Sequence, residues 1–487
     1  MLLKDIITGL KVKHVNGDVN IDIEGISYDS RTVKKGFLFI CKGFNFEEKY
    51  IYDAIDRGAT AIMTEDESIN INDITVIVVE NTRYALAYVS DLFYGHPSEK
   101  LNIIGITGTK GKTTTSYMIK SIMEADSHKV GLIGTIRNMI GDRELKTDRT
   151  TPEALDLQQL FSEMIDEGVD CGVMEVSSHA LELDRVSCID FDTAIFTNLS
   201  RDHLDFHKTF ENYINAKAKL FRMCKTGIVN IDNEYGSKII EQASCNIYTF
   251  GIDKNADITA ENIIYNSDSV EFFIKTPWGN GNLKVGIPGK FTVYNALGAA
   301  AACMASGIPI NSVAKGLEKV SVPGRAEIIE TGRNFVVMID YAHSPDSLEN
   351  ILKTVREFAK GRLICVFGCG GDRDKTKRPI MGEISGRLAD FTVITSDNPR
   401  TEDPDAIIND IEQGLKNTSY PYVKITDRRE AIKFSLGNAK ENDIIVLAGK
   451  GHETYQQFKD KTIHFDEREV VRELLEELDK EEAEKRI

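Results

Sequence analysis

The stretch Gly105-Ile-Thr-Gly-Thr-Lys-Gly-Lys-Thr-Thr-Thr115 decides the fold, because it joins an apolar run to a helical pattern. The run Leu101-Asn-Ile-Ile104 precedes it, and residues 116–125 follow it with helical periodicity. Glycines between a strand and a helix let backbone N–H groups surround an anionic phosphate, and the helix N-terminus adds partial positive charge. The stretch therefore predicts a phosphate-binding loop and the use of ATP.

Lys112 and Thr113 are expected to make the most direct nucleotide contacts of this loop. In such loops the lysine reaches the terminal phosphates and the hydroxyl can ligate Mg²⁺. The strict pattern has a glycine six residues before the lysine, whereas this chain has Ile106 there. A glycine-rich turn without nucleotide is the alternative. The predicted ATP-binding residues of the loop are Gly108, Thr109, Lys110, Gly111, Lys112, Thr113 and Thr114.

The size and composition of the chain restrict its class. Its 487 residues are too many for one ordinary core, and such a length predicts about three domains. A formal net charge of −17 argues against nucleic acid or an anionic membrane as the main partner, since both favour clustered Lys and Arg. The cysteines include no C-x-x-C pair, and no apolar run reaches membrane-spanning length. We expect a cytoplasmic monomer with reduced cysteines, no signal peptide and no membrane insertion.

Short apolar runs that end in polar residues recur along the chain and predict an α/β fold. In the middle of the chain these runs are residues 171–176, 193–198 and 227–232, and helical stretches separate them. This alternation is typical of a parallel sheet whose site lies at the carboxyl ends of the strands. The same alternation returns between Phe335 and Ala448.

Two segments punctuate the chain and predict domain boundaries. Gly95-His96-Pro97-Ser98 lies just before the phosphate-loop strand, and Val322-Pro-Gly-Arg325 lies before the last third. We predict an N-terminal domain at 1–98, a central domain with a P-loop mononucleotide-binding sheet at 99–330, and a C-terminal Rossmann-like domain at 331–487.

Two smaller features complete this division. A β-rich patch at residues 270–285, with Trp278-Gly-Asn-Gly as its turn, interrupts the central domain. The charged residues 466–487 predict a solvated terminal helix.

Further polar groups follow the central strands. Glu175 ends a strand in the domain of the loop, so its carboxylate and the Thr113 hydroxyl suit a Mg²⁺ that bridges the β- and γ-phosphates. Residues 198–207 place two histidines and two aspartates beyond another strand, which suits metal binding or phosphate contact, although surface segments often have this composition. The next helix carries Lys217 and Lys219, and its periodicity alone indicates an ordinary amphipathic helix.

Eight motifs occur in the order found in Mur ligases, and the chain resembles that family over nearly its whole length. The motifs are Thr107-Gly-Thr-Lys-Gly-Lys-Thr-Thr114, Glu175-Val-Ser-Ser-His179, Asn198-Leu-Ser-Arg-Asp-His203-Leu-Asp205, Asn295-Ala-Leu-Gly-Ala-Ala-Ala301, Pro323-Gly-Arg325, Asp340-Tyr-Ala-His343-Ser-Pro345, Gly368-Cys-Gly-Gly-Asp-Arg373 and Asp397-Asn-Pro-Arg400. The resemblance implies a ligase of peptidoglycan precursor synthesis. Its partners would be ATP, Mg²⁺, UDP-N-acetylmuramoyl-L-alanyl-D-glutamate and meso-diaminopimelate, joined through an acyl phosphate.

The resemblance also implies residue roles. A family lysine is carbamylated and binds a second Mg²⁺ beside a histidine; here these are Lys217, as N6-carboxylysine, and His203, with Lys219 as the weaker candidate. The implied catalytic residues are Lys112, Glu175, His203 and Lys217. In the ATP site, Asn295 would contact adenine, Arg325 and Asp340 the ribose side, and His343 a phosphate. The implied contacts to the UDP-linked substrate are Ser30, Thr150, Thr151, Ser177 and Arg185.

The last domain is expected to select the incoming amino acid. The residues that resemble the diaminopimelate-binding set are Arg373, Asp397, Asn398, Pro399, Arg400, Gly449 and Glu453. Diaminopimelate carries a second carboxylate, which a guanidinium can bind through two parallel hydrogen bonds. Alternatives are the same ligase with L-lysine, a folylpolyglutamate-type ligase, and a nucleotide-gated binding protein without chemistry.

Overall fold

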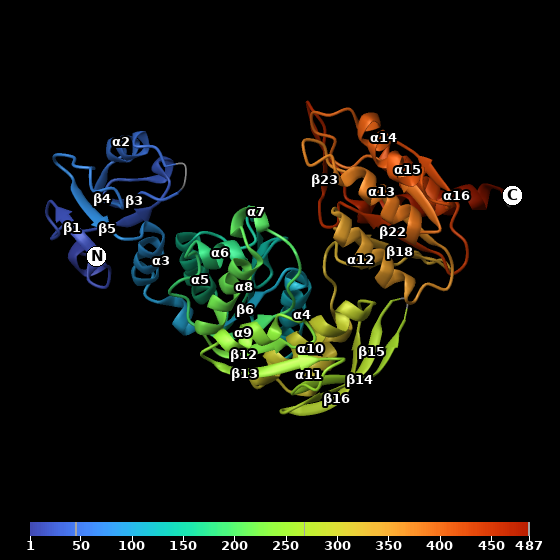
Figure 1. The fold of residues 1–487 in the computed structure, drawn as a ribbon, viewed down its shortest axis with the longest axis horizontal. Coiled ribbons are helices and arrows are strands. Elements are labelled where there is room, and N and C mark those ends of the chain that lie inside the picture. The colour runs from blue at the N-terminus through green and yellow to red at the C-terminus, as the bar shows by residue number, and fades with distance from the viewer. Residues whose placement is uncertain (44–45, 267, 486–487) are drawn as a thin grey trace. The chain divides into compact units, whose positions relative to one another are not determined.

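The computed structural model describes residues 1–43, 46–266 and 268–485, and Figure 1 shows their helices and strands. The chain forms two compact units. Both units combine parallel strands with helices, which confirms the predicted α/β class. Within the described ranges, no helix is both long and apolar enough to cross a bilayer. Unit 1 comprises residues 1–259, 276–278 and 297–313, and unit 2 comprises residues 260–275, 279–296 and 314–487.

The first part of unit 1 is a five-stranded sheet with the order β1-β5-β4-β3-β2. Only β1 is antiparallel to its neighbour. Successive residues Ile62 and Met63 belong to different apolar clusters, so both faces of the sheet are covered. The elements are α1 (Leu3–Ile7), β1 (Val12–Asn16), β2 (Gly25–Ser27), η1 (Ser30–Thr32), β3 (Phe37–Ile40), α2 (Lys49–Asp56), β4 (Ala59–Thr64), β5 (Thr75–Val79), α3 (Thr82–Phe93) and η2 (Pro97–Lys100).

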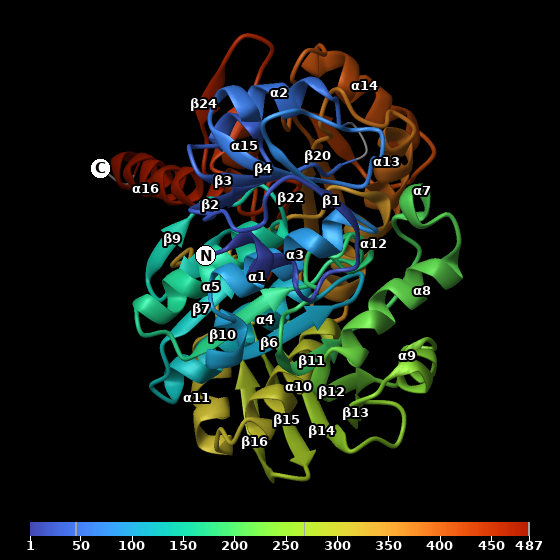
Figure 2. The same ribbon diagram turned by 90° about the vertical axis from the view of Figure 1, so that its left-hand side faces the viewer.

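The rest of unit 1 is built on strands in the order β13-β12-β11-β6-β10-β7-β8-β9. The phosphate-loop strand β6 lies between the parallel strands β10 and β11 (Figure 2). The elements are β6 (Asn102–Thr107), α4 (Lys112–Ala125), β7 (Val130–Ile133), β8 (Asn138–Ile140), β9 (Arg143–Leu145), α5 (Ala154–Asp166), β10 (Cys171–Glu175), α6 (Ser178–Glu182), β11 (Phe191–Phe196), α7 (Leu204–His207), α8 (Phe210–Ala218), η3 (Lys219–Arg222), β12 (Cys224–Asn230), α9 (Gly236–Gln242) and β13 (Asn246–Gly251).

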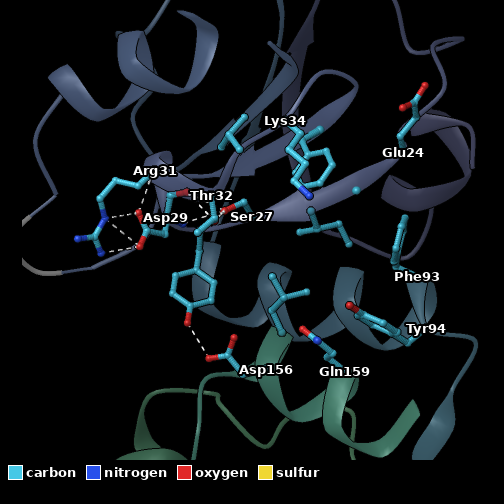
Figure 3. A pocket seen from close by; sticks show the side chains of 16 residues that line it. Glu24, Ser27, Asp29, Arg31, Thr32, Lys34, Phe93, Tyr94, Asp156 and Gln159 are labelled. Atoms are coloured by element: carbon cyan, nitrogen blue, oxygen red, sulfur yellow. Dashed lines mark hydrogen bonds and ion pairs between the residues drawn. The ribbon is translucent and has the colours of Figure 1, made fainter. Parts of the chain in front are cut away.

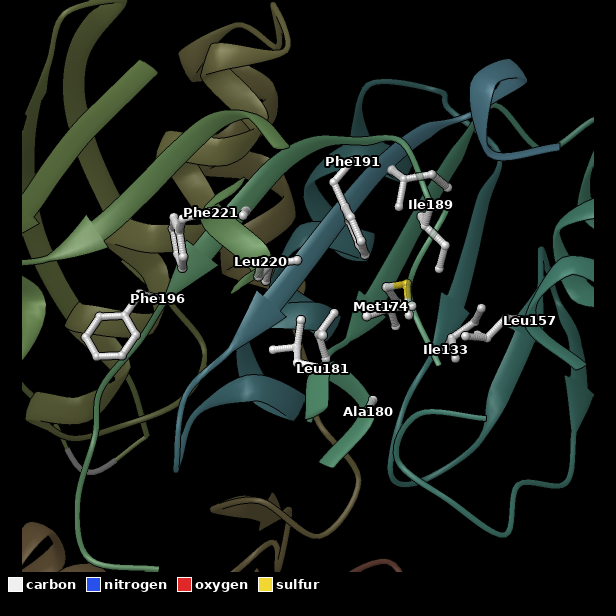
Figure 4. Close-up of a cluster of buried hydrophobic side chains, with 14 of the residues drawn as sticks. Ile133, Leu157, Met174, Ala180, Leu181, Ile189, Phe191, Phe196, Leu220 and Phe221 are labelled. Carbon is white, nitrogen blue, oxygen red and sulfur yellow. The ribbon is translucent and has the colours of Figure 1, made fainter. Parts of the chain in front are cut away.

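The apolar core of this part packs directly against β6 (Figure 4). Phe191, Phe196 and Phe221 are fully buried in it. Burial of one such side chain contributes roughly 1.5–3 kcal/mol. A Cβ at Gly105 would lie 2.7 Å from the Phe191 ring, so this position on β6 needs glycine for close packing. The core thereby holds rigidly the strand that ends in the phosphate loop.

Three strands and two helices follow: β14 (Ile258–Tyr265), β15 (Val270–Thr276), β16 (Gly279–Val285), α10 (Lys290–Ala305) and α11 (Ile310–Lys319). They confirm the β-rich patch, but the predicted turn was misplaced. The chain turns at residues 277–278, and Gly279 already begins β16 with φ 148°, a backbone conformation that glycine adopts without strain.

Unit 2 contains a six-stranded sheet with the order β17-β18-β22-β19-β20-β21. All neighbours are parallel except β17 and β18. Neighbouring residues Ile445 and Val446 of β22 lie in separate apolar clusters, so helices cover both faces. The elements are β17 (Glu327–Ile329), β18 (Val336–Asp340), α12 (Pro345–Arg356), β19 (Leu363–Phe367), α13 (Lys377–Leu388), β20 (Phe391–Ile394), α14 (Pro404–Leu415), β21 (Tyr422–Lys424), α15 (Arg428–Gly437), β22 (Ile444–Ala448), β23 (Tyr455–Gln457), β24 (Thr462–His464) and α16 (Glu467–Lys485).

Candidate active site

The predicted phosphate loop lies between the end of β6 and the start of α4. Gly108 has φ 155° and Gly111 has φ 87°, and the backbone of Gly111 adopts a left-handed conformation that favours glycine. The Lys112 Nζ donates to the carbonyl oxygens of Gly108 at 2.9 Å and Thr109 at 3.1 Å. The ammonium therefore lies against the loop at the amino end of α4.

The end of β11 holds the loop in shape. Asn198 accepts a hydrogen bond from the Lys110 backbone N–H at 3.0 Å and donates to the Lys110 carbonyl oxygen at 2.9 Å. The Thr197 hydroxyl donates to the same carbonyl at 2.7 Å. These bonds explain why an asparagine follows this strand, since they fix the loop backbone before any ligand arrives.

Glu175 is buried at the end of β10, next to the loop strand. Its Oε1 accepts from the Thr135 N–H at 3.0 Å, and its Oε2 accepts from the Thr135 hydroxyl at 2.9 Å. The Thr135 hydroxyl also lies 3.0 Å from that of Thr150. The carboxylate is thus held in one direction while each oxygen keeps a further lone pair.

The oxygen donors in this region suit Mg²⁺. Thr113 and Glu175 supply a hydroxyl and a carboxylate, which are hard ligands. In the described ranges, no three His, Cys, Asp or Glu side chains are grouped to hold a metal. A divalent ion would take its remaining ligands from water and phosphate oxygens, as Mg²⁺ commonly does.

Lys217 reaches the loop from α8. The residue is 1% exposed, its Nζ donates to the Gly108 carbonyl oxygen at 2.9 Å, and the Nζ lies 4.7 Å from the centroid of the Tyr213 ring. Burial, followed by the positive charge of Lys112, lowers the pKa of Lys217 well below its usual range, while Asp202 opposes the shift. Lys219 instead forms a partly exposed ion pair with Glu182 at 2.7 Å.

Three histidines gather beside this lysine. The ring centroids of His179 and His203 are 4.9 Å apart, and those of His179 and His207 are 5.6 Å apart. His203 Nε2 lies 3.6 Å from Asp202 Oδ2. The buried His207 bonds through Nε2 to the Ser178 hydroxyl at 2.9 Å. Burial, with a smaller effect of His179, lowers the pKa of His207 to about 4.

Three of the residues predicted to contact the UDP-linked substrate meet beside β10. The Thr151 hydroxyl donates to the Glu175 carbonyl oxygen at 2.9 Å and to Ser177 Oγ at 3.3 Å. The Arg185 Nη1 donates to the Thr151 carbonyl oxygen at 3.2 Å. Thr150, through Thr135, belongs to the same network.

A charged cluster at this place was missed by the sequence prediction. The buried Glu153 pairs with Lys42 Nζ at 2.6 Å, with Arg185 Nε at 3.0 Å, and with Arg149. Burial alone would raise the pKa of Glu153, but Lys42, Arg185 and Arg149 lower it below the usual value. Three cations around one anion leave net positive charge. The position of Glu153 directly after Thr150-Thr151-Pro152 was the available signal.

Ser30 lies in η1, and a cavity of about 740 Å³ adjoins that short helix (Figure 3). The cavity wall includes residues of β2, η1 and α5, and the Tyr28 hydroxyl donates across it to Asp156 Oδ2 at 2.7 Å. The residues that line the cavity include none of the five predicted substrate contacts.

In unit 2, Arg325, Asp340 and His343 lie together at the end of β18. Asp340 Oδ2 accepts from the Ala326 N–H at 2.8 Å, and burial raises the pKa of Asp340 although Arg325 opposes the shift. The Arg325 guanidinium lies 4.9 Å from the centroid of the Tyr341 ring, and that ring lies 4.6 Å from His343. Asn295 is half-buried on α10.

The predicted amino-acid-binding residues follow β19, β20 and β22. The Asn398 Nδ2 donates to Glu453 Oε2 at 2.8 Å. A Cβ at Gly449, which has φ 116°, would lie 2.7 Å from Asp397 Oδ2, so glycine lets the two loops approach. Lys450 was missed: its buried Nζ donates to Asn398 Oδ1 and to Glu453 Oε2, each at 3.2 Å.

Two arginines flank the loop that follows β19. Arg400, directly after Pro399, has φ 52°, and its Nη1 donates to the Gly371 carbonyl oxygen at 2.9 Å. A Cβ at Gly370 would lie 2.8 Å from Arg400 Nη1 and 3.9 Å from Arg373 Cγ. Both side chains are therefore at the same glycine-rich loop.

Comparisons with known proteins show the family of the chain. The family model of the Mur ligase middle domain matches residues 106–303, and that of the Mur ligase glutamate ligase domain matches residues 324–451. The chain is similar to a solved structure of a UDP-N-acetylmuramoyl-L-alanyl-D-glutamate–2,6-diaminopimelate ligase, with TM-score 0.76 and 32% identity, over 98% of this chain and 99% of that one.

Two curated relatives are similar over almost their full length, and both are named UDP-N-acetylmuramoyl-L-alanyl-D-glutamate–2,6-diaminopimelate ligase. The relative from Caldanaerobacter subterraneus is 50% identical over 483 residues, which cover 99% of this chain and all of the relative. One from Clostridium acetobutylicum is 52% identical over 483 residues, which cover 98% of this chain and all of the relative. The chain belongs to the Mur ligase family and is therefore an ATP-dependent, ADP-forming amide ligase.

Proposed function

We propose that this ligase, of the MurE type, joins meso-diaminopimelate to UDP-N-acetylmuramoyl-L-alanyl-D-glutamate in peptidoglycan precursor synthesis. The names of the full-length relatives support this substrate pair. The observation that carries the proposal is the pair of loops in which Asn398 and Glu453 meet beside the glycine-rich loop of Arg400. They offer both a carboxylate and a guanidinium to a zwitterionic amino acid.

The reaction has two steps. A carboxylate oxygen of the dipeptide attacks the γ-phosphorus of ATP, so that a new P–O bond forms, the bond to the β-phosphate oxygen breaks and ADP leaves. The amine of the amino acid then attacks the acyl carbon, a C–N bond forms, phosphate leaves and the amine loses a proton. Lys112 and the backbone N–H groups of the loop stabilise the charge on the transferring phosphoryl group.

Thr113 and Glu175 would hold Mg²⁺, and His203 with carbamylated Lys217 would hold a second ion. The metal supplies positive charge that neutralises the phosphate oxygens. Carbamylation needs a neutral amine, and the burial that lowers the pKa of Lys217 favours the neutral form. Carbon dioxide adds to the Nζ lone pair, one proton leaves, and the product is an anion at the Gly108 side of the loop.

The remaining substrate contacts are assigned by position. We assign Thr150, Thr151, Ser177 and Arg185, with Ser30, to the UDP-linked peptide; the net positive cluster around Glu153 would favour this polyanion. Asn295, Arg325, Asp340 and His343 would contact the adenosine and phosphate portions of ATP. The domain division at residues 98 and 330 is part of the proposal. We also propose a cytoplasmic monomer.

The test is a reconstituted reaction with ATP, Mg²⁺ and the UDP-linked dipeptide, to which meso-diaminopimelate, L-lysine or L-glutamate is added separately. We expect phosphate release and the mass of the tripeptide product with meso-diaminopimelate. Preference for L-lysine would overturn the amino-acid assignment alone. A parallel reaction contains a folate in place of the dipeptide. Turnover of the folate with glutamate, without reaction of the UDP-linked dipeptide, would overturn the whole proposal.

A further inference from the structure

Arg428 is a fully buried arginine that lies beneath two of the loops described above. Its Nη1 donates to the carbonyl oxygen of Ser396 at 3.3 Å, and its Nη2 donates to that of Ala448 at 2.9 Å. Ser396 immediately precedes Asp397, and Ala448 immediately precedes Gly449. One guanidinium therefore holds both the carbonyl group directly before Asp397 and the carbonyl group directly before Gly449.

The two loops are not joined by strand pairing. They follow β20 and β22, and β19 lies between these strands in the sheet. Arg428 therefore connects two loop origins across the end of β19. A guanidinium can do so because its five N–H donors point in fixed directions from one plane, whereas an ammonium group has no such geometry.

Glu467 sets the direction of that guanidinium from the first residue of α16. Its Oε1 accepts from Arg428 Nε at 2.8 Å, and both side chains are 0% exposed. Desolvation of two charges offsets most of their attraction, so a buried ion pair adds little stability compared with a hydrophobic pair. Stability alone therefore does not account for this pair. The hydrogen bonds from Arg428 to the Ser396 and Ala448 carbonyl oxygens suggest instead that the pair holds the loops in place.

We propose that Arg428 and Glu467 are positioning residues for the incoming amino acid, which keep the loop of Asp397 and Asn398 at a fixed separation from the loop of Gly449 and Glu453. This inference rests on the proposed amino-acid site. Both side chains are fully buried, so they act through the loops and not by touching the substrate. The binding of the amino acid should depend on them, and that of the UDP-linked peptide should not.

The double variant Arg428→Met/Glu467→Leu tests the proposal. It removes both charges, so no unpaired charge is left in the interior and the fold should persist. Since a misplacement of about 1 Å can cost 10²-fold in activity, we expect KM for meso-diaminopimelate to rise by roughly 10-fold or more. KM for the UDP-linked dipeptide and the melting temperature should stay close to those of the wild type.

Two further variants keep the test decisive. Arg428→Lys retains the positive charge beside Glu467 but not the fork, so KM for the amino acid should rise at an unchanged melting temperature. Arg362→Lys is the matched control for Arg428→Lys, because Arg362 pairs with the buried Asp443 at 2.6 Å at the opposite ends of β19 and β22, and the lysine leaves no charge unpaired. It should leave KM for the amino acid unchanged.

The outcomes separate this inference from the proposed function. A wild-type KM for the amino acid in both Arg428 variants would overturn the positioning role, and so would an equal rise in Arg362→Lys. If the double variant does not fold, the KM of Arg428→Lys for the amino acid alone tests the positioning role. If the wild type uses another amino acid, the proposed substrate is wrong, and KM for that amino acid then tests the positioning role.

Discussion

The Nζ of Lys217 donates a hydrogen bond to the carbonyl oxygen of Gly108, at 2.9 Å, although 109 positions separate the two residues. The bond places an amine from α8 directly on the phosphate loop. Tyr213, one helical turn earlier, bonds through its hydroxyl to Thr109 at 3.1 Å and thus fixes the same helix to the same loop. The loop and the lysine therefore form one site.

Lys112→Ala should abolish most of the activity without unfolding the protein. In the proposed mechanism, Lys112 is the cation nearest the transferring phosphoryl group, and the variant loses it. If that contact supplies about 4 kcal/mol to the transition state, kcat should fall by roughly 10³-fold. Steady-state phosphate release measures the effect. Lys120→Ala, which breaks a surface pair with Glu124 on the same helix, is the control and should keep normal turnover.

Lys217→Ala should be inactive, and short carboxylic acids should partly restore its activity. The missing group in the proposal is a carbamate anion and not an ammonium, so a small carboxylate can occupy its place. Lys219→Ala is the matched control on the same segment and should remain active. Intact mass in bicarbonate buffer should show one added CO₂ on the wild type only. An active wild type whose Lys217 is unmodified would refute the role.

The stability of the protein should fall as the pH is lowered from 6.5 towards 4, partly because of His207. The pKa of this histidine is about 4 in the folded chain and near 6.5 when unfolded. Between these values the unfolded chain binds a proton that the folded chain does not, so acid favours unfolding. Thermal melts of His207→Gln should show a weaker pH dependence over this window. The exposed His14→Gln should behave as the wild type.

Arg400→Ala should lower the kcat/KM for meso-diaminopimelate far more than that for L-lysine. Loss of one charge-assisted pair to a carboxylate costs about 2–5 kcal/mol, whereas lysine has no carboxylate at that end. We expect kcat/KM for diaminopimelate to fall by roughly 30-fold or more. Because Arg400 also bonds to Gly371, an equal fall for both amino acids would assign it a purely structural role. The exposed Arg387→Ala is the control.

Local sequence determined much of this protein. The alternation of apolar runs and helical stretches was enough to predict parallel strands β10, β11, β12 and β22 to within a few residues, because buried parallel strands are continuously apolar. The order of glycines, Lys112 and Thr113 between a strand and a helix was enough to predict the phosphate loop. Both patterns could be predicted because they are short and depend only on residues that are neighbours in the sequence.

Tertiary structure alone decided which charged residues share a site. Helical periodicity did not separate Lys217 from Lys219, and only packing shows one buried on the loop and the other paired at the surface with Glu182. Lys42, Glu153 and Lys450 had no sequence signal of their own strong enough to assign. Their partners come from distant segments, and burial makes those contacts strong because water no longer screens the charges. The residues next to it in the sequence therefore predict neither the partner of a charged residue nor its burial.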